Sequence, residues 1–141
     1  MKKLSLSAVF ILIAGFIFYS SASAMDMHGD KVHMSHVDGH DFMYSMIDMG
    51  KKAEKSGLSK NMDGMYHLMV HVKKGDKFVE GAKTAFVVKG PDGKVQKAMA
   101  MEMSKGYGAD IKMKKKGVYE IKVKTMKDGK AMMDTFKYEM K

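Results

Sequence analysis

Methionine and histidine are the residues of this sequence with the clearest capacity for chemistry. The 141 residues include 18 methionines and six histidines but no cysteine. A thioether is a soft, uncharged ligand that suits Cu(I), and an imidazole suits copper and zinc. Hard cations would need clusters of oxygen ligands, whereas the acidic residues of this chain are scattered singly. The composition therefore favours copper as the ion that the chain would bind.

The segment 65–72 places four of these side chains in one row. Because the side chains of a strand alternate between its two faces, the apolar residues of this segment share one face and the soft ligands share the other. The row consists of Met65, His67, Met69 and His71. Side chains two positions apart are separated by about 6.6 Å, so neighbouring ligands can converge on one ion. The alternative is that a helix covers this face, with Met69 as filler and the histidines bonded to backbone.

A second row of methionines has the same two-residue period. It consists of Met99, Met101 and Met103. Met99 and Met101 share their parity with Val95, and methionine is an adaptable filler of apolar cores, so we expect these two in the core. Met103 lies at the end of this segment beside a Ser104-Lys105-Gly106 turn. That position favours an exposed metal ligand.

Residues 25–41 form a polar arm that has no sustained helical or strand period. The arm carries His28, His33, His36 and His40. Imidazoles at such close spacing favour capture of Cu(II) or zinc. A chelate that uses the terminal amine would need a histidine at position one or three, and a mature chain beginning at Met25 lacks it. The alternatives are a tail whose histidines bind nothing and, as a weaker interpretation, a pH switch.

Several classes of protein are excluded by what the sequence lacks. Without cysteine, the chain can form no disulfide framework, thiolate zinc site or iron–sulfur cluster. It contains no phosphate-binding loop, zinc-protease motif or nucleophile elbow, so we assign no catalytic residue and expect a protein that is not an enzyme. The formal net charge is +9, and every basic residue is a lysine. Many of these lysines alternate with apolar residues, which is typical of solvated strand faces rather than of a nucleic-acid interface.

The hydrophobic pattern predicts the elements that position these residues. Residues 1–24 have the charged start, the apolar run and the Ala-x-Ala end of a secretory signal peptide, so we expect export, most simply to the periplasm, with an uncleaved anchor as the alternative. Apolar residues at helical spacing predict a short amphipathic helix over 42–57, followed by a linker over 58–64. A period of two from 65 to 141, broken by turn signals, predicts an antiparallel β-sandwich of six or seven strands. The strands after the first are expected at 83–89, 94–103, 107–114, 117–126 and 131–140.

Part of the chain resembles the YtkA-like and FixH-like group of exported bacterial β-sandwiches. The resemblance covers roughly residues 64–140. It rests on a first strand at 66–70, Gly81-Ala82 before the second, the Pro91-Asp92-Gly93 turn, Gly106-Tyr107 and Gly117-Val118-Tyr119. It implies an immunoglobulin-like fold with distant similarity to CopC-type periplasmic copper carriers. Those carriers use a histidine at the mature N-terminus, where this chain has Met25, so no functional residue is carried over from them.

Two hypotheses about function follow. The first is an exported metal-binding protein that carries or sequesters copper, with Cu(I) favoured at the sandwich and Cu(II) or zinc possible at the arm. Its ligands would be Met65, His67, Met69, His71 and Met103, with help from the arm histidines, and a membrane or periplasmic protein would receive the ion. The second is an extracytoplasmic interaction module of the YtkA-like type. Its methionines would serve as core and as an oxidation buffer, because methionine sulfoxide formation is reversible.

Overall fold

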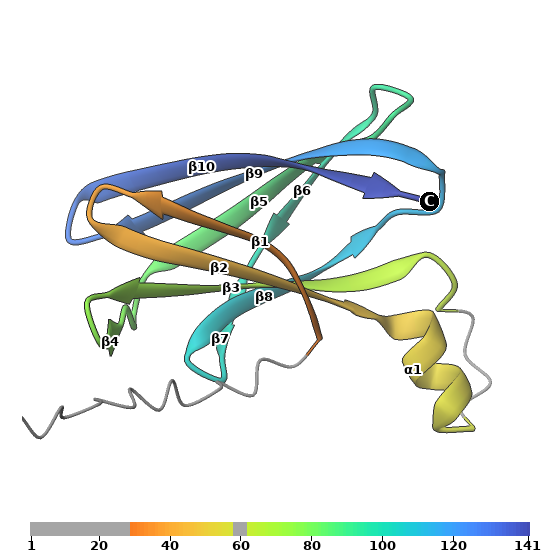
Figure 1. Ribbon diagram of the computed structural model, residues 1–141, viewed down its shortest axis with the longest axis horizontal. Coiled ribbons are helices and arrows are strands. Elements are labelled where there is room, and N and C mark those ends of the chain that lie inside the picture. Colours follow the sequence, from red (N-terminus) through yellow and green to blue (C-terminus); the bar gives the residue numbers. More distant parts are fainter. Residues whose placement is uncertain (1–28, 58–61) are drawn as a thin grey trace, which may run out of the picture.

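The computed structural model of the protein describes residues 29–57 and 62–141. Their strands form two antiparallel sheets packed face to face, with one short helix at the margin (Figure 1). This confirms the predicted β-sandwich, although the described residues form ten strands rather than six or seven. The predicted signal peptide and His28 lie outside the described residues.

Sheet A has six strands and sheet B has four. The order across sheet A is β1-β2-β3-β8-β7, with β4 paired to β3 off this path, and the order across sheet B is β10-β9-β5-β6. The strands of sheet A are β1 (Asp30–Val37), β2 (His40–Asp48), β3 (Met65–Lys74), β4 (Lys77–Phe78), β7 (Met101–Met103) and β8 (Gly106–Lys112). Those of sheet B are β5 (Lys83–Lys89), β6 (Val95–Met99), β9 (Gly117–Lys127) and β10 (Lys130–Met140). Figure 1 shows β1 running beside β10, so β1 links the two sheets along one side.

The core lies between the two sheets and is filled from both by alternating side chains, as the two-residue period requires. Alternate side chains over 107–113 and 119–123 point into this core. The largest fully buried side chains are Tyr44, Tyr107, Phe42, Phe86, Leu68, Ile111, Met113 and Ile121. Sheet A contributes Leu68, Val70 and Val72 of β3 to this core, which turns the opposite face of β3 outward.

The prediction of a helix over 42–57 is wrong for its first half. Residues 40–48 form β2, and the helix α1 (Met49–Lys55) lies between β2 and β3. Phe42, Tyr44 and Met46 also have a two-residue period, and all three are buried against the other sheet. Asp48 ends the strand and caps the helix, because its Oδ1 accepts a hydrogen bond of 3.1 Å from the backbone N–H of Lys51. No helix in the described part of the chain has the length and apolar character needed to cross a membrane.

Most of the predicted arm is likewise an element of the sandwich. Residues 30–37 form β1, which pairs with β2 through a two-residue turn at Asp38 and Gly39. Both turn residues have positive φ, 49° and 76°, which is the backbone of the hairpin turns that Asp-Gly favours. Val32 and Val37 pack against the core. The strand was not predicted because its sequence is largely polar, and Val32 and Val37 are its only side chains that pack against the hydrophobic core.

The predicted strand 94–103 is divided between the sheets. Residues 95–99 form β6 in sheet B, and after Ala100 the chain continues as β7 in sheet A. Met99 and Met101 are 70% and 71% exposed, so the expectation that they belong to the core is wrong. The physical reason is that Val95, whose parity Met99 shares, itself faces solvent, whereas Ala98 packs against the core.

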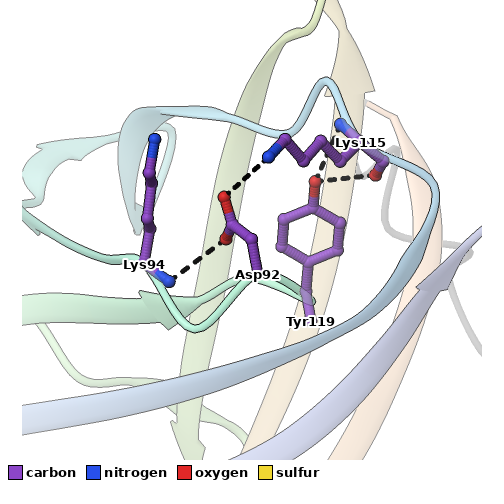
Figure 2. Close-up of polar contacts among 4 residues, drawn as sticks. All are labelled: Asp92, Lys94, Lys115 and Tyr119. Atoms are coloured by element: carbon purple, nitrogen blue, oxygen red, sulfur yellow. Dashed lines mark hydrogen bonds and ion pairs between the residues drawn. The ribbon is translucent and has the colours of Figure 1, made fainter.

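A polar clamp ties the β5–β6 turn to the loop between β8 and β9 (Figure 2). The Asp92 carboxylate accepts hydrogen bonds from the Lys94 backbone N–H at 3.1 Å and from the Lys115 ammonium at 3.0 Å. The Tyr119 hydroxyl donates to the Lys115 carbonyl at 2.7 Å and accepts from the Lys115 N–H at 3.1 Å. The hydrogen bond from Lys115 is the main reason that the pKa of Asp92 is lowered. The clamp holds the end of β8, the strand over which the candidate site lies.

Candidate metal centre

The predicted row of ligands lies on the outer face of sheet A. Met65, His67, Met69 and His71 alternate along β3 with the core residues, as the two-residue period requires. Met69 and His71 are nevertheless only 3% and 5% exposed, while Met65 and His67 are half-buried. The middle of an outward face is therefore shielded from water. Such a shielded, polarisable surface is unusual for a solvated sheet.

Two glycines of β8 make room for these side chains. A Cβ atom at Gly108 would lie 2.6 Å from His67 Nε2 and 3.1 Å from Met69 Cγ. A Cβ atom at Gly106 would lie 2.9 Å from His71 Nε2. The three side chains therefore lie over backbone that carries no side chain of its own. We call Gly106 and Gly108 the glycine floor. Sequence reasoning missed it, although Gly106-x-Gly108 was visible as a two-residue period of glycine within a strand.

The ring of His67 is oriented by a carboxylate. Its Nδ1 atom lies 2.7 Å from Asp110 Oδ1, and Asp110 is its direct partner across β3 and β8. An ionised carboxylate only accepts hydrogen bonds, so Nδ1 carries the proton of the neutral ring and Nε2 keeps its lone pair. A carboxylate that holds one imidazole nitrogen is the usual outer shell of a metal-bound histidine. The free Nε2 lies over Gly108, beside Met69.

The ring of His71 is oriented by the backbone. Its Nε2 atom lies 3.2 Å from the carbonyl oxygen of Ser104. A carbonyl oxygen can only accept, so Nε2 donates and the lone pair remains on Nδ1. That Nδ1 is buried and has no hydrogen-bond partner among the described residues, which costs stability unless a ligand supplies one. Burial lowers the pKa of His71 and so favours the neutral ring that a metal ion requires.

The strand register adds thioethers on both sides of these histidines. Met43 of β2 lies directly opposite His71. On the other side, Met103 pairs with Gly106 and Met101 pairs with Gly108. Directly opposite positions have their Cβ atoms about 5 Å apart, so the register places these methionines beside Gly106, Gly108 and His71. The sequence analysis missed Met43 because it placed this residue on a helix, and it missed Met101 because it placed this residue in the core.

A buried hydroxyl lies in the same region. Ser45 of β2 is directly opposite Met69, is fully buried, and its Oγ has no hydrogen-bond partner among the described residues. With His71 Nδ1 it makes a second unpartnered polar atom on this face. Native proteins rarely leave such atoms unpaired. Both atoms are therefore available to a water molecule or a ligand.

The other predicted ligands do not join this group. His33 stacks on Phe136 with ring centroids 4.6 Å apart, on the core side of β1. His36 Nδ1 lies 2.7 Å from Asp41 Oδ1 at an exposed position, and His40 Nδ1 lies 2.8 Å from the Asp38 carbonyl in the hairpin turn. Met65 lies at the start of β3, opposite Lys112. The three described arm histidines are thus separated from one another.

The kinds of metal-binding atoms on this face determine which metal ions it suits. The described residues contain no group of three or more His, Asp or Glu side chains close enough to hold a metal ion. What the outer face of sheet A gathers is imidazole nitrogen and thioether sulfur, which are ligands suited to copper in its reduced state.

Comparison with known proteins finds relatives by structure only. No family model matches the sequence, and no curated protein matches it significantly. A copper-bound variant of FetP from uropathogenic Escherichia coli strain F11 has a TM-score of 0.55 at 17% identity, over 79% of this chain and 93% of that chain. Copper-reconstituted P19 from Campylobacter jejuni has a TM-score of 0.52 at 17% identity, over 79% and 96%. A copper-bound variant of P19 gives 0.51 at 15% identity, over 79% and 94%.

These likenesses concern the fold. They show that the chain shares a β-sandwich architecture with FetP and P19 along nearly their whole length. This agrees with the β-sandwich fold that the sequence resemblance implied. It does not test the YtkA-like or FixH-like assignment.

Proposed function

We propose that this protein is an exported copper-binding protein that carries or sequesters Cu(I) on the outer face of sheet A. The proposed ligands are His67 through Nε2, His71 through Nδ1 and Met69 through its sulfur. Met103, Met43 and Met101 are the neighbouring thioethers that complete the sphere or exchange with it. The observation that carries the proposal is that each imidazole has one nitrogen fixed by an acceptor and the other left free.

The spacing along β3 restricts how these ligands are used. Same-face neighbours are about 6.6 Å apart, so Met69 can share an ion with His67 or with His71. His67 and His71 are two such steps apart, and their rings lie over different glycines. The proposal therefore places Met69 at the centre, with an imidazole to either side.

Cu(I) is favoured over other ions by charge as well as by ligand type. Neutral imidazole and thioether compensate little of a divalent charge, whereas a soft monovalent ion suits both. The copper-bound state of FetP and P19, which share the fold, supports copper at a coarse level. Exposed Met34 and Met101, at the two sides of the face, offer thioethers through which an ion could pass to a receiving protein.

Competition titration of the full chain tests the proposal. The chain is titrated with Cu(I) under reducing conditions against a chromogenic Cu(I) chelator, with Cu(II) and Zn(II) in parallel and native mass spectrometry for stoichiometry. Met69→Leu, His67→Gln and His71→Gln are each expected to weaken Cu(I) binding about tenfold or more, since even outer-shell changes cost 10- to 100-fold. Near-ultraviolet circular dichroism shows whether each variant keeps its fold.

Two variants of the same chemistry at other places are the controls. His36→Gln and Met133→Leu change an exposed imidazole and an exposed thioether away from the glycine floor, and they are expected to leave Cu(I) affinity unchanged. Equal losses in controls and site variants would contradict the proposed site. Unchanged Cu(I) affinity in all three folded site variants would contradict it as well.

A further inference from the structure

The outer face of sheet B carries six exposed lysines. Its outward side chains alternate with core residues such as Phe86 and Ile121. We call this surface the lysine face; its lysines are Lys83, Lys89, Lys97, Lys122, Lys124 and Lys137. All six are exposed, and they come from all four strands of the sheet.

The strand register brings these charges close to one another. Lys97 of β6 and Lys122 of β9 both lie directly opposite Val87 of the central strand β5. Two acidic side chains share the face, Glu120 and Glu139, and Glu120 pairs with Lys122 at 3.5 Å. Six lysines against two glutamates leave a surplus of positive charge that nothing on the face neutralises. The surplus is spread over the face, because no two of these lysines lie directly opposite one another on neighbouring strands and Glu120 lies opposite both Lys89 and Lys137.

Exposed apolar side chains are interspersed among these lysines. Met99 lies opposite Ala85, which in turn lies opposite Lys124, and Lys124 lies opposite Met133. The exposed apolar residues of the face are Val95, Met99, Val118, Met126 and Met133. A surface that serves only to keep the protein soluble has no use for such a cluster. The combination of flexible cations and short apolar tips instead suits the boundary between lipid headgroups and acyl chains.

We propose that the lysine face docks the protein on an anionic lipid surface. The choice of lipid over a protein partner rests on residue type. Protein interfaces are depleted in Lys, and lysine is the most frequent residue of this face. Lysines act as point charges on flexible stems, which match the diffuse negative charge of anionic headgroups.

The docked orientation separates two surfaces of the molecule. The lysine face and the glycine-floored face of sheet A lie on opposite sides of the sandwich (Figure 1). Docking through sheet B would leave sheet A directed away from the lipid and open to a partner in solution. The inference does not depend on the copper proposal, because it concerns the other sheet and is tested without metal.

Vesicle binding by the metal-free full chain tests the inference. Binding is measured by co-sedimentation with vesicles of phosphatidylglycerol and phosphatidylcholine in equal parts and with vesicles of phosphatidylcholine alone. The triple variant K97Q/K122Q/K124Q removes the centre of the lysine face. Because one lysine near an anionic surface changes binding about fivefold, this variant is expected to bind the anionic vesicles about a hundredfold more weakly. Binding of the parent protein is expected to fall steeply as salt is raised.

A variant of equal charge provides the control. K51Q/K52Q/K55Q removes three exposed lysines from α1 and is expected to lower binding only a few-fold. The neutral vesicles report any contribution of the apolar run at residues 4–19. Absence of binding to anionic vesicles, or equal binding to neutral ones, would overturn the inference. Equal losses of vesicle binding in the two triple variants would also overturn it. If K97Q/K122Q/K124Q weakened binding to soluble polyglutamate but not to vesicles, the face would instead suit an acidic protein partner, and the inference would be wrong.

Discussion

Hydrogen-bond partners of single atoms define the candidate metal centre at the scale of the residue. His67 and His71 differ in which nitrogen is held, Nδ1 by Asp110 in one ring and Nε2 by Ser104 in the other. Each arrangement leaves one lone pair free, and in His71 that nitrogen is buried without a partner among the described residues. Preorganised rings of this kind lose little freedom when an ion binds.

Removing the carboxylate behind His67 should weaken copper binding without loss of fold. Asp110 is largely exposed, so Asp110→Ala leaves the core intact but frees the ring to rotate and to exchange its tautomer. We expect Cu(I) affinity to fall 10- to 100-fold, measured by chelator competition. Asp76→Ala, at an exposed turn position, is the control. Affinities equal to the parent in both variants would show that Asp110 does not position the ligand.

Filling the glycine floor should displace the ligands. A methyl group at Gly108 would lie 2.6 Å from His67 Nε2, closer than unbonded atoms can approach, so the ring must move in Gly108→Ala. We expect Cu(I) affinity to fall at least tenfold, comparable to loss of an outer-shell partner. The measurement is the same competition, with circular dichroism to confirm the sheet. Gly50→Ala in α1, where the nearest atom would lie at 3.2 Å, is the matched control, and an equal loss there would contradict a specific role of Gly108.

The hairpin of β1 and β2 is one element that joins the two sheets by polar contacts. Asp134 of β10 accepts hydrogen bonds from Ser35 of β1 and from Tyr44 of β2, the latter at 2.7 Å. The Tyr44 ring is fully buried, and its burial, with the nearby Asp134 charge, raises the pKa of its hydroxyl. The hydroxyl therefore stays protonated and donates. His33 completes the contact by stacking on Phe136 of β10.

Removing the Tyr44 hydroxyl should lower the free energy of unfolding. Tyr44→Phe keeps the ring but deletes a buried donor to a carboxylate, and hydrogen bonds to charged groups contribute about 1.5 to 3 kcal/mol. Because Asp134 is partly exposed, we expect the lower end, about 1 to 2 kcal/mol, measured by urea denaturation. Tyr138→Phe is the control, since that ring packs against the core and its hydroxyl has no hydrogen bond among the described residues. Equal effects in the two variants would show that the inter-sheet bond contributes nothing.

Residues 30–37 form an integral strand of the sandwich rather than a dispensable arm. They add a strand to sheet A, contribute Val32 and Val37 to the core and contact β10. A chain beginning at Phe42 would lose this strand, and the inner side of β2 would lose the side chains that cover it.

Truncation should therefore act on stability before it acts on metal binding. We expect a chain beginning at Phe42 to melt about 10 °C below one beginning at Gly29, since the loss of two partly buried valines costs about 2 kcal/mol and each 1 kcal/mol shifts the midpoint by about 4 to 8 °C. Thermal circular dichroism of the two chains without metal measures this. Similar melting of both would mean that β1 is an appendage after all.

Local pattern by itself determined the β-sandwich and the shared outward face of the four candidate ligands on β3. These follow from a two-residue period, which depends only on the alternation of Cβ atoms along a strand. Met65, His67, Met69 and His71 share a face in any fold in which this segment is a strand. The expectation was therefore correct without knowledge of the neighbours of β3.

Tertiary structure alone decided what lies beside that row. Phe42 to Ile47 fits a helical and a strand period alike, and only pairing with β3 and burial against sheet B selected the strand. The same pairing placed Met43 opposite His71, and the passage of the chain from β6 to β7 brought Met101 beside Gly108. Register and sheet membership are long-range properties, because they depend on contacts between residues far apart in the sequence. The candidate ligands were therefore readable from the chain, but the glycine floor, the fixed ring nitrogens and the surrounding thioethers were not.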